Sequence, residues 1–145
     1  MRFAIFAVFM VVLGSCKPGD PQVNEEDVPR YEALARTLPL GERYALYRRV
    51  YDSDLPPMDD LADEVAELGS TAMQFVVAKA KSGDVTDISS SIPVISAYTR
   101  MAGTPCSADD IKDIQRNIRN AFVHEETASI VSRRLHAACG PPELD

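Results

Sequence analysis

The stretch HEETA, residues 124–128, places a histidine next to two glutamates and raises the question of a metal site. The zinc motif H-E-x-x-H requires a second histidine four residues after the first, and Ala128 stands at that position. The only other histidine, His136, lies about 120° away around a helix, and zinc sites usually have four ligands. We therefore predict neither a metal site nor a cofactor, and we interpret His124 and His136 as surface residues.

Acidic residues gather in DSDLPPMDDLADE, residues 52–64. Asp52 and Asp54 begin like a calcium-binding loop, but the third ligand and the required glycine are missing. Four further acids share much of one helix face, which is typical of a solvated surface: Asp60, Asp63, Glu64 and Glu67. The chain also contains no G-x-S-x-G or S-x-x-K motif and no glycine-rich phosphate loop. We predict a protein without catalytic residues, and a hydrolase whose site is assembled from distant residues remains the alternative.

Tyrosine and arginine are concentrated in ERYALYRRVY, residues 42–51. At helical spacing the tyrosines share one face and the arginines lie to its sides. Both residue types concentrate binding energy at protein interfaces, which makes five residues candidates for partner binding: Arg43, Tyr44, Tyr47, Arg48 and Tyr51. The other interpretation is that the tyrosines belong to the domain's own core, with their hydroxyls at its rim.

Apolar residues recur at helical spacing almost throughout residues 28–138. Proline and glycine divide this pattern into helices that end at Pro39, near residues 52–57, at Gly69, at Gly83 and at Gly103. Ser70 is expected to be the N-cap of the fourth helix, and Pro93 to kink the fifth or to move its start to about Ile92. The pattern predicts an all-α fold of about six or seven helices, either a compact helical bundle or a short α-solenoid.

The N-terminal residues have the layout of a secretory signal peptide. Arg2 is followed by eleven uncharged, mostly apolar residues, and this stretch is too short to cross a bilayer of roughly 30 Å as a helix. Leu13-Gly14-Ser15-Cys16 resembles the lipobox of bacterial lipoproteins, in which a cysteine follows an aliphatic and two small residues. The resemblance implies cleavage before Cys16 and acylation of that cysteine, so that the acyl chains attach the protein to a membrane. Lys17 in place of aspartate implies the outer membrane.

Cys106 and Cys139 are left as a pair once Cys16 is lipidated, and disulfides persist in exported proteins. Residues 107–138 contain neither glycine nor proline, so a single long helix is conceivable. The apolar stripe that ends at Phe122 does not continue, however, and a new one begins at Ile130. A break near His124–Thr127, with Thr127 as N-cap, gives an antiparallel hairpin that brings the two cysteines within bonding distance. We predict this hairpin and a Cys106–Cys139 disulfide.

Helices predicted to end at residues 68, 102 and 139 suggest a repeat of two helices. The stretch LADEVAELGSTAMQFVVAKAKSGD, residues 61–84, loosely resembles the helix–turn–helix units of HEAT-like α-solenoids. This resemblance implies stacked helical hairpins and no particular activity.

The chain has a formal net charge of −7 and no basic cluster, which excludes nucleic acid as the expected partner. We divide it into a cleaved signal peptide (1–15), a lipidated cysteine with a flexible tether (16–27) and a single all-α domain (28–145). The expected protein is a lipid-anchored lipoprotein on the periplasmic face of the outer membrane that binds or scaffolds a protein partner. An immunity-type lipoprotein that neutralises a toxin in the periplasm is the alternative.

Overall fold

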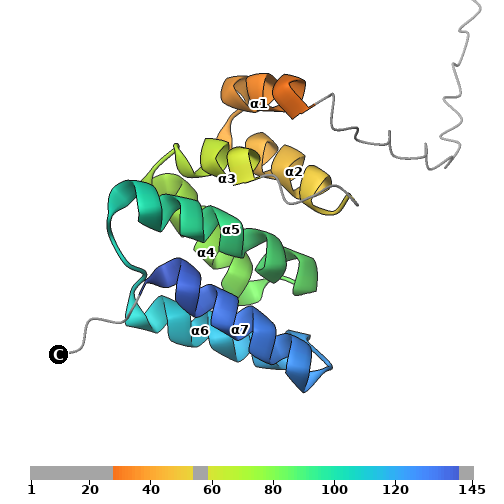
Figure 1. Ribbon diagram of the computed structural model, residues 1–145, viewed down its shortest axis with the longest axis vertical. Helices are drawn as coiled ribbons and strands as arrows, with labels where there is room; N and C mark the ends of the chain where they lie inside the picture. Colours follow the sequence, from red (N-terminus) through yellow and green to blue (C-terminus); the bar gives the residue numbers. More distant parts are fainter. Residues whose placement is uncertain (1–27, 54–58, 141–145) are drawn as a thin grey trace, which may run out of the picture.

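A computed structural model describes residues 28–53 and 59–140 (Figure 1). These residues form seven α-helices and no strand, which confirms the all-α prediction. The helices are α1 (Val28–Thr37), α2 (Leu40–Tyr51), α3 (Asp59–Ala66), α4 (Ser70–Ser82), α5 (Val85–Ala102), α6 (Ala108–Ala121) and α7 (Glu125–Cys139). The lipobox and the rest of residues 1–27 lie outside the described residues.

The helices are stacked in layers, as Figure 1 shows from α1 at the top to the α6–α7 hairpin at the bottom. Helices α2 and α3 pack below α1, α4 and α5 form the next pair, and α6 and α7 form the last. Helix α5 contacts α3 on one side and α7 on the other, while α4 contacts α6. Pairs of helices that pack on neighbouring pairs are the arrangement found in short α-solenoids.

Local capping signals set several helix ends. Asp84 caps α5 by accepting a hydrogen bond from the main-chain N–H of Asp87 at 2.9 Å, and Ser107 caps α6 in the same way. Gly103 ends α5 with φ of 64°, a left-handed conformation that favours glycine. The prediction that Ser70 is the N-cap of α4 is wrong by one residue: Gly69, with φ of 74°, occupies that position and Ser70 is the first helical residue.

Pro93 lies inside α5, so of the two predicted alternatives, a kink at Pro93 or a later start of the helix near Ile92, the later start is wrong. The helix begins a full two turns earlier because Asp84 caps it there and because Ile88, Ile92 and Ile95 are all buried on both sides of the proline. Burying several isoleucines can offset the roughly 3 kcal/mol that an interior proline costs. Proline has no N–H, so the carbonyl of Ser89 lacks its usual donor four residues on.

The C-terminal residues form the predicted antiparallel hairpin, closed by a Cys106–Cys139 disulfide. The Cα atoms of the two cysteines are 4.9 Å apart, and the main-chain N–H of Cys106 also donates to the carbonyl of Cys139. The break falls slightly earlier than predicted, because His124 rather than Thr127 occupies the N-cap of α7. No side chain caps this end of α7, and the disulfide joins the opposite end of the hairpin.

A buried polar cluster joins α2 to α5. The hydroxyl of Tyr44 lies 3.1 Å from Ser90 Oγ and 3.2 Å from Ser91 Oγ. Both serine hydroxyls donate to main-chain carbonyls of α5 one turn earlier, so the phenol of Tyr44 is the donor in this cluster. Tyr47 donates in turn to the carbonyl of Ser90 at 2.8 Å. The cluster therefore needs Tyr44 in its neutral, protonated form.

Alkaline solution is expected to destabilise the domain through Tyr44. Burial raises the pKa of this phenol above its usual value. Because the folded-state pKa exceeds the unfolded value of about 10, the stabilisation is complete below pH 10 and is lost as the pH rises further. We expect the melting temperature to fall as the pH rises above about 10, and to fall less steeply in Tyr44→Phe. An equal decrease of melting temperature with pH in the wild-type protein and in Tyr44→Phe would show that Tyr44 is not the cause.

Candidate functional site

The tyrosine and arginine residues of α2 do not form an exposed binding face. Tyr44 and Tyr47 are each 3 % exposed and Arg43 is 7 % exposed, so these three belong to the interior and the binding hypothesis is wrong for them. The rings of Tyr44 and Phe75 meet edge to face, with centroids 5.4 Å apart. An amphipathic stripe looks the same whether its apolar face meets a partner or the protein's own core, and here it meets the core.

The guanidinium of Arg43 joins the ends of two helices. It donates to the carbonyls of Arg36 and Leu38 at the end of α1, at 3.0 and 3.2 Å, and to the carbonyl of Glu64 in the last turn of α3, at 2.8 Å. Helix C-termini carry free carbonyl groups and a partial negative charge, which a buried cation complements. Arg43 therefore stabilises the packing of α1, α2 and α3.

Arg48 and Tyr51, the other two binding candidates on α2, lie at the domain surface but interact with other residues of their own chain. Arg48 makes ion pairs with Asp87 at 2.6 Å and with Asp84 at 3.5 Å. The hydrogen bond from the main chain of Asp87 lowers the pKa of Asp84, and the charge of Arg48 adds to that effect. Tyr51 is half-buried, and burial raises the pKa of its hydroxyl while the positive charge of Arg134 on α7 partly offsets the rise.

The histidines and the acidic cluster are not brought together. His124 is at the start of α7, whereas the imidazole of His136 contacts the side-chain amide of Gln115 on α6. Asp63 pairs with Arg100 at 2.5 Å, and Glu64 pairs with Arg36 at 2.6 Å. Within residues 28–53 and 59–140, no three His, Cys, Asp or Glu side chains are placed to hold a metal ion. Asp54 lies outside the described residues.

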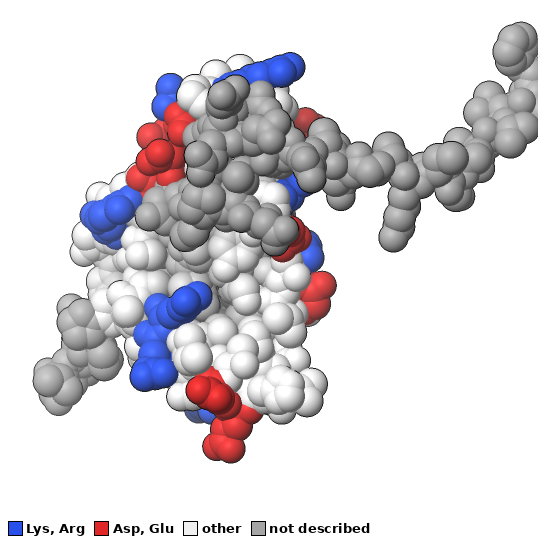
Figure 2. Space-filling view, turned by 45° about the vertical axis from the view of Figure 1, so that its right-hand side comes forward, with Lys and Arg blue, Asp and Glu red and all other residues white. Residues whose placement is uncertain are grey.

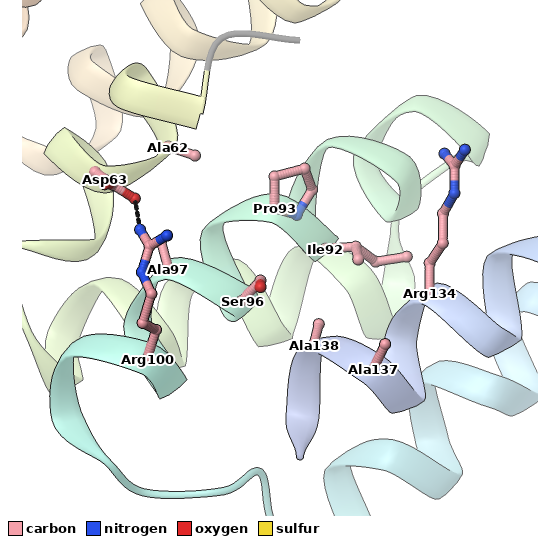
Figure 3. A pocket seen from close by; sticks show the side chains of 10 residues that line it. All are labelled: Ala62, Asp63, Ile92, Pro93, Ser96, Ala97, Arg100, Arg134, Ala137 and Ala138. Atoms are coloured by element: carbon pink, nitrogen blue, oxygen red, sulfur yellow. Dashed lines mark hydrogen bonds and ion pairs between the residues drawn. The ribbon is translucent and has the colours of Figure 1, made fainter.

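A groove runs between α3, α5 and α7, with a cavity of about 330 Å³ at its centre (Figure 3). Small side chains make up much of its lining: Ala62 from α3, Ser96 and Ala97 from α5, and Ala137 and Ala138 from α7. Ile92 and Pro93 complete the apolar part of the wall. Small residues at these positions keep the space between the three helices open to the surface.

A second cavity of about 460 Å³ extends the groove toward the end of α5. It shares Ser96, Arg100, Ala137 and Ala138 with the first cavity, and it reaches Gly103 to Pro105 and Gly140. The Thr99 hydroxyl holds α5 against α7 here by donating to the carbonyl of Ala138 at 2.6 Å. Cys139 lines the same cavity, so the disulfide helps to fix this part of the groove.

Two arginines mark the ends of the central cavity. Figure 3 shows Arg100 turned toward Asp63 at one end and Arg134 extending from α7 at the other. The charge of Arg100 is compensated by that ion pair, whereas no carboxylate among the described residues lies within ion-pair distance of Arg134. Charged side chains otherwise gather in separate groups on the face drawn in Figure 2, with broad uncharged areas between them.

None of these groove residues is identified by a motif in the sequence. They come from three helices that are far apart along the chain, and each alanine or serine on its own is an ordinary helix residue. Pro93 is the one local signal, because a proline inside a helix is costly and usually marks a point where the helix is kinked or interrupted.

Comparison of the chain with models of protein families, with curated proteins and with solved structures gives no significant match. None of the helices in the described part of the chain is long and apolar enough to span a bilayer.

Proposed function

We propose that the protein is a lipid-anchored envelope lipoprotein that binds another protein and has no catalytic role of its own. The groove between α3, α5 and α7 is the observation that carries the binding part of this proposal. It is open to the surface, lined by small and apolar side chains and bordered by charged groups, and these features suit a segment of another protein.

The lipid anchor is supported by residues 1–16 of the sequence. A charged start, a short apolar stretch and the tetrad that ends at Cys16 together match the signal and lipobox of bacterial lipoproteins. Residues 17–27 then serve as a tether, which reaches at most about 37 Å when fully extended. This length allows the groove to meet a partner in the periplasm or at the inner surface of the outer membrane.

Protein binding at the groove can be tested by photo-crosslinking in intact cells. A photoreactive amino acid replaces Ser96, which is exposed in the groove, and a matched control carries it at Asn120, which is exposed on α6 and does not line the groove. We expect a discrete adduct with another protein from position 96 and none from position 120. Identical adducts from both positions, or none from position 96, would contradict the proposal.

The identity of the adduct also separates two roles. A single toxin bound in a one-to-one complex would indicate an immunity-type lipoprotein, whereas a resident envelope protein would indicate a scaffold.

Lipidation is tested by the intact mass of the protein extracted from membranes. We expect the mass of residues 16–145 plus three acyl chains, and we expect Cys16→Ala to abolish both the added mass and the membrane association. An unmodified mass for the wild-type protein would remove the anchor from the proposal without affecting the groove experiment.

A further inference from the structure

We infer that the groove between α3, α5 and α7 takes an acidic segment of the partner protein, with a carboxylate of that segment paired to Arg134. This inference rests on the proposed function, because it names the chemistry of the partner that the groove is proposed to bind.

The charges of the groove favour an acidic ligand. Among the described residues that line the two cavities, Asp63 is the one carboxylate, and it is already paired with Arg100. Arg134 lines the central cavity and has no carboxylate partner in the part of the chain that the structure describes. As far as the structure describes its lining, the groove therefore presents one uncompensated guanidinium, although the whole chain has a net charge of −7. Arginine and carboxylate groups form paired, charge-assisted hydrogen bonds that also fix orientation.

The floor of the groove favours close approach by a polypeptide main chain. The alanines at positions 62, 97, 137 and 138 project only a methyl group each. Helix surfaces made of such residues let a second backbone come near, as small residues do at close helix–helix contacts.

The length of the groove sets the size of the bound segment. Its lining runs along α5 from Pro93 to Gly103. At a rise of 1.5 Å per residue this part of the helix is about 15 Å long, which corresponds to about four or five residues of an extended chain. A short linear segment with one acidic residue near the Arg134 end fits these dimensions.

A library of random heptapeptides displayed on phage tests the inference directly. Selection is carried out with the wild-type chain, with Arg134→Glu and with Arg133→Glu. Arg133 is the matched control, because it is exposed on the same helix but does not line either cavity. We expect the wild-type chain and Arg133→Glu to select peptides with aspartate or glutamate at one position, and Arg134→Glu to select lysine or arginine there.

Affinities of the selected peptides give the quantitative result. Fluorescence anisotropy with the best acidic peptide is expected to show at least tenfold weaker binding to Arg134→Glu and a less than twofold change for Arg133→Glu. Far-UV circular dichroism confirms that the variants keep their helical fold. An unchanged preference in Arg134→Glu, or selection without any charge preference, would overturn the inference.

Combination with the crosslinking experiment distinguishes failure of the inference from failure of the proposed function. A protein adduct at position 96 without charge selectivity leaves the docking function intact and removes only the acidic partner. If neither an adduct nor selected peptides are found, both the acidic partner and the docking function are contradicted. An adduct with residues 141–145 of the same chain, or with a second copy of it, overturns the inference because the groove then has a different occupant.

Discussion

Replacement of Arg43 by methionine is expected to lower the free energy of unfolding by about 3–5 kcal/mol. The guanidinium donates to three main-chain carbonyls at the ends of α1 and α3, and its side chain is only 7 % exposed. Methionine fills a similar volume but donates no hydrogen bond, so one buried acceptor and two partly buried acceptors lose their partner. Each buried acceptor without a donor costs about 1–3 kcal/mol.

The measurement is urea unfolding of the full chain, with Arg49→Met as the matched control. Arg49 lies on the same helix, is exposed and makes no hydrogen bond or ion pair with the described residues. We expect its replacement to change stability by less than about 0.5 kcal/mol. The loss of unfolding free energy in Arg43→Lys should lie between those of Arg43→Met and Arg49→Met, because an ammonium group cannot reach three carbonyls in the geometry of a guanidinium. A loss below 1 kcal/mol in Arg43→Met would show that the three bonds contribute little.

Loss of the Cys106–Cys139 disulfide is expected to cost about 3–4 kcal/mol of stability. The bond joins residues 33 apart in the sequence and closes the α6–α7 hairpin, so it removes many conformations from the unfolded chain. The comparison of oxidised with reduced wild-type protein isolates the bond, because the side chains are otherwise identical. Both the oxidised and the reduced sample carry Cys16→Ala, which prevents thiol–disulfide exchange with the third cysteine.

The double variant Cys106→Ala, Cys139→Ala provides the second measurement. We expect the stability of this variant to be unaffected by reductant. Its unfolding free energy should depend more steeply on urea concentration than that of the oxidised protein, because an unlinked chain exposes more surface when it unfolds. Cys139 is fully buried, so its replacement also removes some packing. Stability equal to that of the oxidised protein would indicate that helix packing alone holds the hairpin.

The α6–α7 hairpin was predictable because its signals are local. The apolar stripe changes face between Phe122 and Ile130, and the two cysteines can meet only if the chain reverses. Pro93 shows where local signals fail. The preference of proline for the first turn of a helix was outweighed by the cap at Asp84, which is itself a local signal, and by buried isoleucines, whose burial depends on the neighbouring helices.

The sequence by itself determined the all-α class, the positions of most helix ends and the disulfide, since helical periodicity, proline, glycine and cysteine spacing act over short distances. Only the tertiary structure decided what the polar residues do. Arg43 binds carbonyl groups, which every residue type carries equally, so no pattern of side chains could indicate its partners. The groove likewise exists only where α3, α5 and α7 pack together, because alanines on three separate helices form a cavity by their arrangement in space.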